Sequence, residues 1–238
     1  MSYLEQIDDG SLWLADGETV SFYGFPYPTP CVVARLSDDG GLWIWSPIRL
    51  ADELRAEVDS LGHVAHLVSP NKLHHLYLAQ WKAAYPAAKV WGLRSTINRF
   101  PALAFAGTLG ASPPPDWARD FDQAWFRGSF MLDEVVFFHR RSRAAIFADL
   151  IQAFDDRFVS RNWSWWQRPL ARLDGIAAAN PGAPREWRLS FIDRDAARSA
   201  RAKALAWDCE RVLVAHGEWA QSGGREYVRR ALSWLGPG

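Results

Sequence analysis

The sequence predicts an α/β protein of four layers, in which two mixed β-sheets pack face to face and helices cover their outer sides. Two features of the 238-residue chain indicate this architecture. Each half opens with β-hairpin patterns, over residues 11–48 and 123–151, where β-branched and aromatic runs are separated by turn residues. Each half then continues with helical patterns and further short strands. We expect one domain over residues 1–238, long enough to bury a full core.

The first half contains a predicted β-α-β unit. Apolar residues at intervals of three and four predict a helix over residues 50–62. A strand over residues 63–70, a helix over 71–85 and a strand over 88–93 follow. Parallel strands deliver their carboxyl ends to one edge of a sheet, so we expect the side chains that follow these strands to lie at that edge.

The second half is predicted to end in helices around one more strand. Helical patterns cover residues 149–180 and 193–208. The strand 211–218 then precedes a last helix over 224–236. In the hairpin before them, alternation points Glu134 and His139 to opposite faces, and we expect His139 at the surface.

Composition and charge argue against several classes of protein. The 27 basic residues balance the 27 acidic ones, so no overall field attracts nucleic acid or an anionic membrane. The two cysteines, Cys31 and Cys209, lack C-x-x-C spacing, which fits a reducing cytosol. No apolar run approaches the ~20 residues of a membrane span, and the N-terminus lacks a signal-peptide pattern. We therefore expect a cytoplasmic protein.

Four side chains that can bind metals follow predicted strands directly. His74 and His75 come after "VAHLVSP", Asp149 after "RAAIFA" and His216 after "RVLVA". Imidazole and carboxylate groups are ligands that zinc, iron and manganese accept. Three of these residues also have a simpler interpretation: Asp149 as a helix cap, His216 as the partner of a turn, and His74 as a solvent-facing side chain.

These motifs resemble those of the metallo-β-lactamase-fold superfamily across almost the whole chain. In that superfamily a loop T-H-x-H-x-D-H follows a strand, an acidic residue follows a hairpin strand, and a late strand ends in G-H-G. The segment "SPNKLHH" aligns with the loop, "AIFADLI" with the hairpin and "VLVAHGE" with the late strand. More narrowly, "SPNKLHHLYLAQW" and "DEVVFFHRRSR" resemble an uncharacterised branch whose loop is altered in this way.

The resemblance implies half of a two-metal site. Pro70 and Lys72 stand where the superfamily holds two histidine ligands of the first metal, so that site is absent or rebuilt. One divalent metal is expected at the second site, namely zinc, with iron or manganese as alternatives, or none if the site is degenerate. The implied metal ligands are His74, His75, Asp149 and His216.

Lys72 and Asp149 are the predicted catalytic residues. The ammonium of Lys72 would stabilise developing negative charge on a substrate or pair with Asp149. A solvated lysine is the alternative interpretation.

The segment "RNWSWWQRP" is unusually aromatic. On a predicted helix Trp163 and Trp166 share a face, so we predict that they pack against the sheet. The alternative is an aromatic wall over the metal site.

The predicted function is that of a hydrolase with one metal, which cleaves an ester, lactone or thioester of a small-molecule substrate. The alternative is a non-catalytic binding or regulatory module with a degenerate metal site. Four protein ligands would close a tetrahedral ion, so catalysis would need a fifth position or one ligand that does not bind. The sequence leaves open whether the protein is an enzyme.

Overall fold

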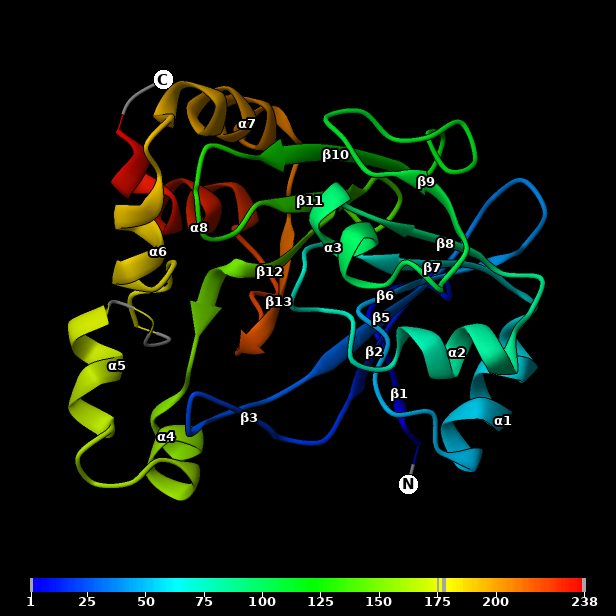
Figure 1. Ribbon diagram of the computed structural model, residues 1–238, viewed down its shortest axis with the longest axis horizontal. Coiled ribbons are helices and arrows are strands. Elements are labelled where there is room, and N and C mark those ends of the chain that lie inside the picture. Colours follow the sequence, from blue (N-terminus) through cyan, green and yellow to red (C-terminus); the bar gives the residue numbers. More distant parts are fainter. Residues whose placement is uncertain (1, 175, 177–178, 237–238) are drawn as a thin grey trace.

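The computed structural model describes residues 2–174, 176 and 179–236, which form two mixed β-sheets and a separate hairpin (Figure 1). The first sheet has seven strands in the order β1-β2-β5-β6-β7-β8-β9. The second has four strands in the order β10-β11-β12-β13, and β3 pairs with β4 alone. Strands β6 to β9 run parallel to one another, as do β12 and β13, while the other pairs are antiparallel.

The elements of the described chain have the following bounds. The strands are β1 (Leu4–Gln6), β2 (Leu12–Asp16), β3 (Val20–Phe22), β4 (Phe25–Tyr27), β5 (Pro30–Arg35), β6 (Leu42–Trp45), β7 (Val64–Ser69), β8 (Lys89–Gly92), β9 (Phe105–Thr108), β10 (Phe121–Phe126), β11 (Glu134–His139), β12 (Ala144–Ala153) and β13 (Arg211–Gly217). The helices are α1 (Asp52–Leu61), α2 (Leu78–Ala84), α3 (Arg94–Arg99), α4 (Asp156–Asn162), α5 (Arg168–Asp174), α6 (Arg185–Ser190), α7 (Arg194–Ala206), α8 (Gly224–Ala231) and the short 3-10 helix Ser233–Leu235.

Three clusters of buried side chains define four layers. Between the sheets, Trp43 of β6 packs on Phe121 of β10 and Phe137 of β11, with ring centroids 4.3 and 5.0 Å away. The outer face of the first sheet packs against α1 and α2. The outer face of the second sheet packs against α6, α7 and α8. The predicted arrangement of helix, sheet, sheet and helix is confirmed.

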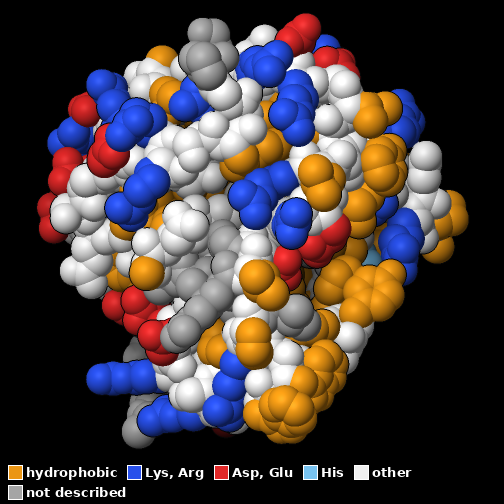
Figure 2. Space-filling view, turned by 90° about the vertical axis from the view of Figure 1, so that its left-hand side faces the viewer, with side chains coloured by type: hydrophobic (Ala, Val, Ile, Leu, Met, Phe, Trp, Pro, Cys, Tyr) orange, Lys and Arg blue, Asp and Glu red, His pale blue; other side chains and the backbone are white. Residues whose placement is uncertain are grey.

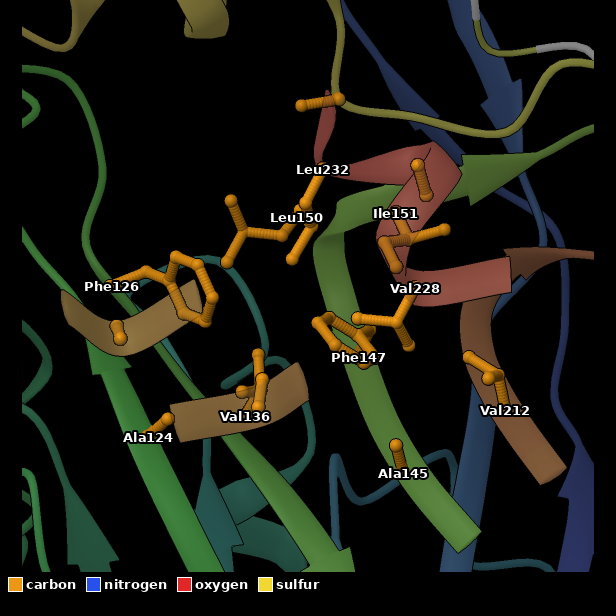
Figure 3. Packing of buried hydrophobic residues seen from close by; sticks show 14 of the residues in the cluster. Ala124, Phe126, Val136, Ala145, Phe147, Leu150, Ile151, Val212, Val228 and Leu232 are labelled. Atoms are coloured by element: carbon orange, nitrogen blue, oxygen red, sulfur yellow. The ribbon is translucent and has the colours of Figure 1, made fainter. Parts of the chain in front are cut away.

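The outer core of the second sheet shows how β12 is held in place. Leu150 and Ile151 of this strand lie beside Val228 of α8 and the adjacent Leu232 (Figure 3). Two successive residues of a regular strand would point to opposite faces. Both enter the same cluster because β12 bulges between Phe147 and Gln152, where its register with β13 shifts.

Two predicted helices are wrong over part of their length. The helical pattern predicted over residues 149–180 begins too early, because residues 149–153 belong to β12, all ten residues of which are buried and which pairs with β13 as far as Ala153. The helix α4 begins only after Asp155, whose Oδ1 accepts a bond from the Phe158 amide and caps it. The helix predicted over residues 71–85 is confined to α2, because residues 70–77 form a loop.

His139 is buried rather than exposed, so the surface prediction is wrong. Its side chain is 1% exposed and lies against Phe121, with ring centroids 4.9 Å apart. Nδ1 of His139 lies 2.7 Å from the Ser142 hydroxyl, so this buried ring nitrogen has a hydrogen-bond partner.

The aromatic segment divides between core and surface. Trp163 is 3% exposed and its indole N–H donates to the Pro26 carbonyl at 3.0 Å, as a core position requires. Trp165 and Trp166 are 81% and 54% exposed. The prediction for Trp166 is wrong because the chain leaves the helix at Trp163, which adopts an extended conformation.

Charged groups of both signs are interspersed on the face shown in Figure 2, and hydrophobic side chains gather towards its lower right edge. No helix among the described residues combines the length and the apolar character needed to cross a bilayer.

His66 makes the stability of the fold dependent on pH. Its Nδ1 accepts the indole N–H of Trp91 at 3.1 Å, and because an indole can only donate, this nitrogen carries no proton. Burial lowers the pKa of His66 to about 4. The unfolded chain, with a histidine pKa of about 6.5, therefore binds a proton before the folded protein does as the pH falls.

The folded protein is therefore expected to lose stability as the pH falls from about 6.5 towards 4. Through His66 alone, the free energy of unfolding should fall by about 2 kcal/mol between pH 7 and pH 5. Urea unfolding of the protein and of His66→Gln at both pH values measures this loss, which should be smaller in the variant. His63→Gln, at an exposed position, is the control and should keep the full loss. An unchanged loss in His66→Gln would contradict this explanation.

Candidate metal centre

Three segments far apart in the sequence bring ligand atoms together at one edge of the sheets. His74 lies in the loop after β7, Asp149 in the bulge of β12, and His216 near the end of β13. One ligand atom from each of the three residues lies within 4.8 Å of the other two. Their side chains are only 7–9% exposed, so the site lies below the surface of the protein.

Ser46 and Trp45 contact the ring of His74 and hold it inward. Nδ1 lies 2.7 Å from the hydroxyl of Ser46, and the ring stacks on Trp45 with centroids 5.7 Å apart. Ser46 follows β6 directly and adopts a left-handed conformation with φ 51°, which is uncommon for a residue with a side chain. With Nδ1 held by Ser46, the Nε2 atom lies 3.2 Å from Oδ2 of Asp149.

His216 presents a nitrogen lone pair to the site. Its Nδ1 lies 2.9 Å from the carbonyl oxygen of Pro28, and a carbonyl can only accept, so this nitrogen carries the proton. In the neutral ring Nε2 is then unprotonated, yet it lies 3.1 Å from the carboxylate oxygen Oδ1 of Asp149. Two lone pairs at this distance require a positive charge between them, which is either a second proton on His216 or a cation.

A glycine fixes the chain directly after His216. Gly217 has φ 115°, and a side chain at this position would collide with the carbonyl group of Ala153. The close approach of β13 to β12 therefore depends on this residue. It keeps His216 opposite Asp149.

Asp149 is the residue that the two histidines share. Burial raises the pKa of its carboxyl group, but the adjacent imidazoles of His74 and His216 outweigh burial and lower the pKa below its ordinary value. The group therefore stays negatively charged at neutral pH. Two neutral imidazoles and one carboxylate form a donor set that fits Zn²⁺, Fe²⁺ or Mn²⁺.

Two polar residues beside the ligands were not identified from the sequence. Asn71 and Glu134 are both fully buried. The Asn71 amide donates to Oδ2 of Asp149 at 2.8 Å and to Oε2 of Glu134 at 3.1 Å. Burial, together with the neighbouring charge of Asp149, raises the pKa of Glu134. The available signal was a glutamate that directly precedes the apolar run "VVFF" of a strand.

His75 does not join the group of ligands. Its ring packs against Phe100, which follows α3, with ring centroids 4.5 Å apart. Burial and the nearby charge of Arg99 lower the pKa of His75. The side chains of adjacent residues in this loop diverge, so when His74 points to Asp149 its neighbour points away. Three of the four predicted ligands therefore lie together.

Lys72 does not form an ion pair with Asp149 in the described part of the chain. Both oxygens of Asp149 are already engaged, Oδ1 with His216 and Oδ2 with His74 and Asn71. The side chain of Lys72 is half-buried in the same loop.

The sequence profile of a family described as a domain of unknown function, DUF4336, matches residues 10–161. The chain belongs to this family. The matched region contains His74 and Asp149, whereas His216 lies beyond it. No curated protein sequence matches this DUF4336 protein.

Solved structures show which fold the DUF4336 protein has. It is similar to a metallo-β-lactamase from Hirschia baltica, with 12% identity, coverage of 99% of this chain and 98% of that chain, and a TM-score of 0.61. A metallo-β-lactamase from Erythrobacter litoralis has 14% identity, coverage of 98% and 91%, and a TM-score of 0.60. FIM-1 from Pseudomonas aeruginosa, in its mono-zinc form, has 10% identity, coverage of 98% and 93%, and a TM-score of 0.61. The protein therefore has the metallo-β-lactamase fold, as its motifs predicted.

Proposed function

We propose that this protein is a metal-dependent hydrolase with a single divalent metal held by His74, Asp149 and His216. The observation that carries the proposal is the number of ligands. With His75 directed away, three protein ligands remain, and catalytic zinc sites keep three protein ligands so that a fourth position stays open. The mono-zinc form in which FIM-1 was solved supports occupancy by one metal in this fold.

The substrate class that we propose is a small ester, lactone or thioester. A divalent ion in this site would act as a Lewis acid that polarises a carbonyl group and lowers the pKa of water. Ser46 and the Pro28 carbonyl hold the two imidazoles in orientation, as the outer partners of metal-binding histidines do. We propose that Lys72, from the same loop as His74, stabilises the negative charge that develops on the substrate oxygen. Zinc is the metal we propose first, with iron and manganese as the alternatives.

One observation favours a second candidate, a non-catalytic binding module with the same ion. The three ligand side chains are only 7–9% exposed, which leaves little open surface for a substrate. In this case the ion would stabilise the contact between the two sheets without turnover.

Hydrolysis assays with defined metal content separate the two functions. Protein purified without chelator is assayed on aryl esters, lactones and thioesters, then stripped with a chelator and reloaded separately with Zn²⁺, Fe²⁺ or Mn²⁺. We expect hydrolysis of one of these classes to disappear on stripping, to return with one metal, and to be absent in His216→Ala. A protein that binds the metal stoichiometrically but hydrolyses none of the three classes in any metal form would overturn the hydrolase in favour of the binding module.

A further inference from the structure

We propose that Asn71 and Glu134 form a positioning pair, which sets the geometry of His74 and Asp149 before an ion binds. The inference rests on the proposed metal site and deepens it, because it names residues that bind no metal but determine how well the site binds one. Both side chains are fully buried. Neither residue is among the metal ligands or the catalytic residues that the sequence predicts.

Asn71 joins the loop that carries His74 to the strand that carries Asp149. Its Oδ1 accepts the amide N–H groups of Leu73 and His74, at 2.8 and 3.3 Å, and so shapes the loop. Its Nδ2 donates to Oδ2 of Asp149 and to Oε2 of Glu134. An asparagine side chain has two donors and two acceptor sites, and all four are used here.

Glu134 holds the backbone of the bulge in β12. Its Oε1 accepts the amide of Ala148 at 2.9 Å, and its Oε2 accepts the amides of Asp149 and Leu150 at 2.8 and 3.3 Å. The ladder to β13 is interrupted here, between Phe147 and Gln152. A buried amide without an acceptor is costly, so Glu134 replaces the acceptors that a regular strand pair would provide.

Glu134 and Asn71 both hydrogen-bond to Asp149, one to its main chain and the other to its side chain. Glu134 fixes the main chain of Asp149, and Asn71 fixes its carboxylate. A bulge held in this way points the Asp149 side chain at His74 and His216. In a regular strand, the alternation of side chains between the two faces of the sheet would alone determine its direction. Outer partners of this kind typically contribute 10–100-fold to the affinity for the metal.

The experiment compares Glu134→Gln and Asn71→Ala with the wild type and with a control at Gln123. Gln123 of β10 is also fully buried, and its Nε2 donates to the carbonyls of Gly110 and Ser112, so Gln123→Ala removes a buried polar link in the same sheet without touching the site. Zn²⁺ affinity is measured by competition with a chromophoric chelator, and the ligand geometry by the absorption spectrum of bound Co²⁺. Urea unfolding reports the stability of each variant.

We expect both positioning variants to bind Zn²⁺ about 10–100-fold more weakly and to change the Co²⁺ spectrum. Gln123→Ala should keep the wild-type affinity and spectrum, even if it is destabilised as much as the two positioning variants are. Glu134→Gln preserves the volume of the side chain, so it tests the inference even if Asn71→Ala fails to fold. Folded positioning variants with wild-type affinity and spectrum would overturn the inference while the proposed function stands.

A readout in the ion-free protein keeps the two proposals distinguishable. Hydrogen exchange of the Ala148, Asp149 and Leu150 amides should be slow in the wild type and faster in Glu134→Gln, with the rest of β12 unchanged. If the wild type binds no metal, the proposed function fails, and this exchange pattern still decides whether Glu134 holds the bulge. Equal exchange in both proteins would refute the positioning role.

Discussion

Replacing His74 by alanine is expected to weaken Zn²⁺ binding by more than about 100-fold, since changes to the outer partners of a metal ligand alone cost 10–100-fold. The substitution removes one of three donors and leaves a carboxylate and one imidazole, which cannot hold an ion in a three-ligand geometry. Equilibrium competition with a chromophoric chelator measures the affinity directly. The effect on binding should exceed that of any substitution in the surrounding loop.

The adjacent residue offers a matched control for this substitution. His75→Ala removes the same side chain one position further along the loop, where the ring packs on Phe100 and not on Asp149. Its Zn²⁺ affinity is expected to stay at the wild-type value. Equal losses in His74→Ala and His75→Ala would mean that both histidines bind the ion, and the three-ligand site would then be wrong.

The second large effect is expected in the core between the sheets. Trp43 is fully buried and contacts Phe121 and Phe137 of the opposite sheet, so Trp43→Ala should lower the free energy of unfolding by about 3–5 kcal/mol. The loss combines the transfer of an indole from water with the cavity that remains. Urea unfolding at pH 7 measures it.

Trp165→Ala is the control for the loss of a tryptophan as such. This side chain is 81% exposed, so the substitution should change stability by less than about 0.5 kcal/mol. A loss in Trp43→Ala as small as in Trp165→Ala would contradict the packing of the two sheets through this residue.

The layers of the fold could be predicted because they depend on patterns within short segments. Alternation over residues 134–139 places Val136 in the outer cluster and Phe137 in the inner one, as a strand between two layers requires. The extent of β12 could not be predicted in the same way. Its last residues are compatible with either a helix or a strand, and pairing with β13, some 60 residues later in the sequence, decides between them.

The site shows the same division between local and distant causes. Ligand-type residues that follow strands led to His74, Asp149 and His216. The loop that carries the two adjacent histidines is hydrogen-bonded to Asn71, whose side chain in turn donates to Glu134 and Asp149, 63 and 78 positions away. Contacts over such distances leave no local pattern, so the sequence did not separate His75, which packs on Phe100, from His74, and it did not point to Asn71 and Glu134 as hydrogen-bond partners at the site.

The central claim is that one divalent ion binds among His74, Asp149 and His216. Anomalous diffraction from crystals of protein purified without chelator, recorded on both sides of the zinc absorption edge and of the iron and manganese edges, tests it most directly. We predict one anomalous peak per chain, in contact with these three side chains and separate from His75. A metal-replete preparation with no peak there, or with a peak bound by other residues, would contradict the claim.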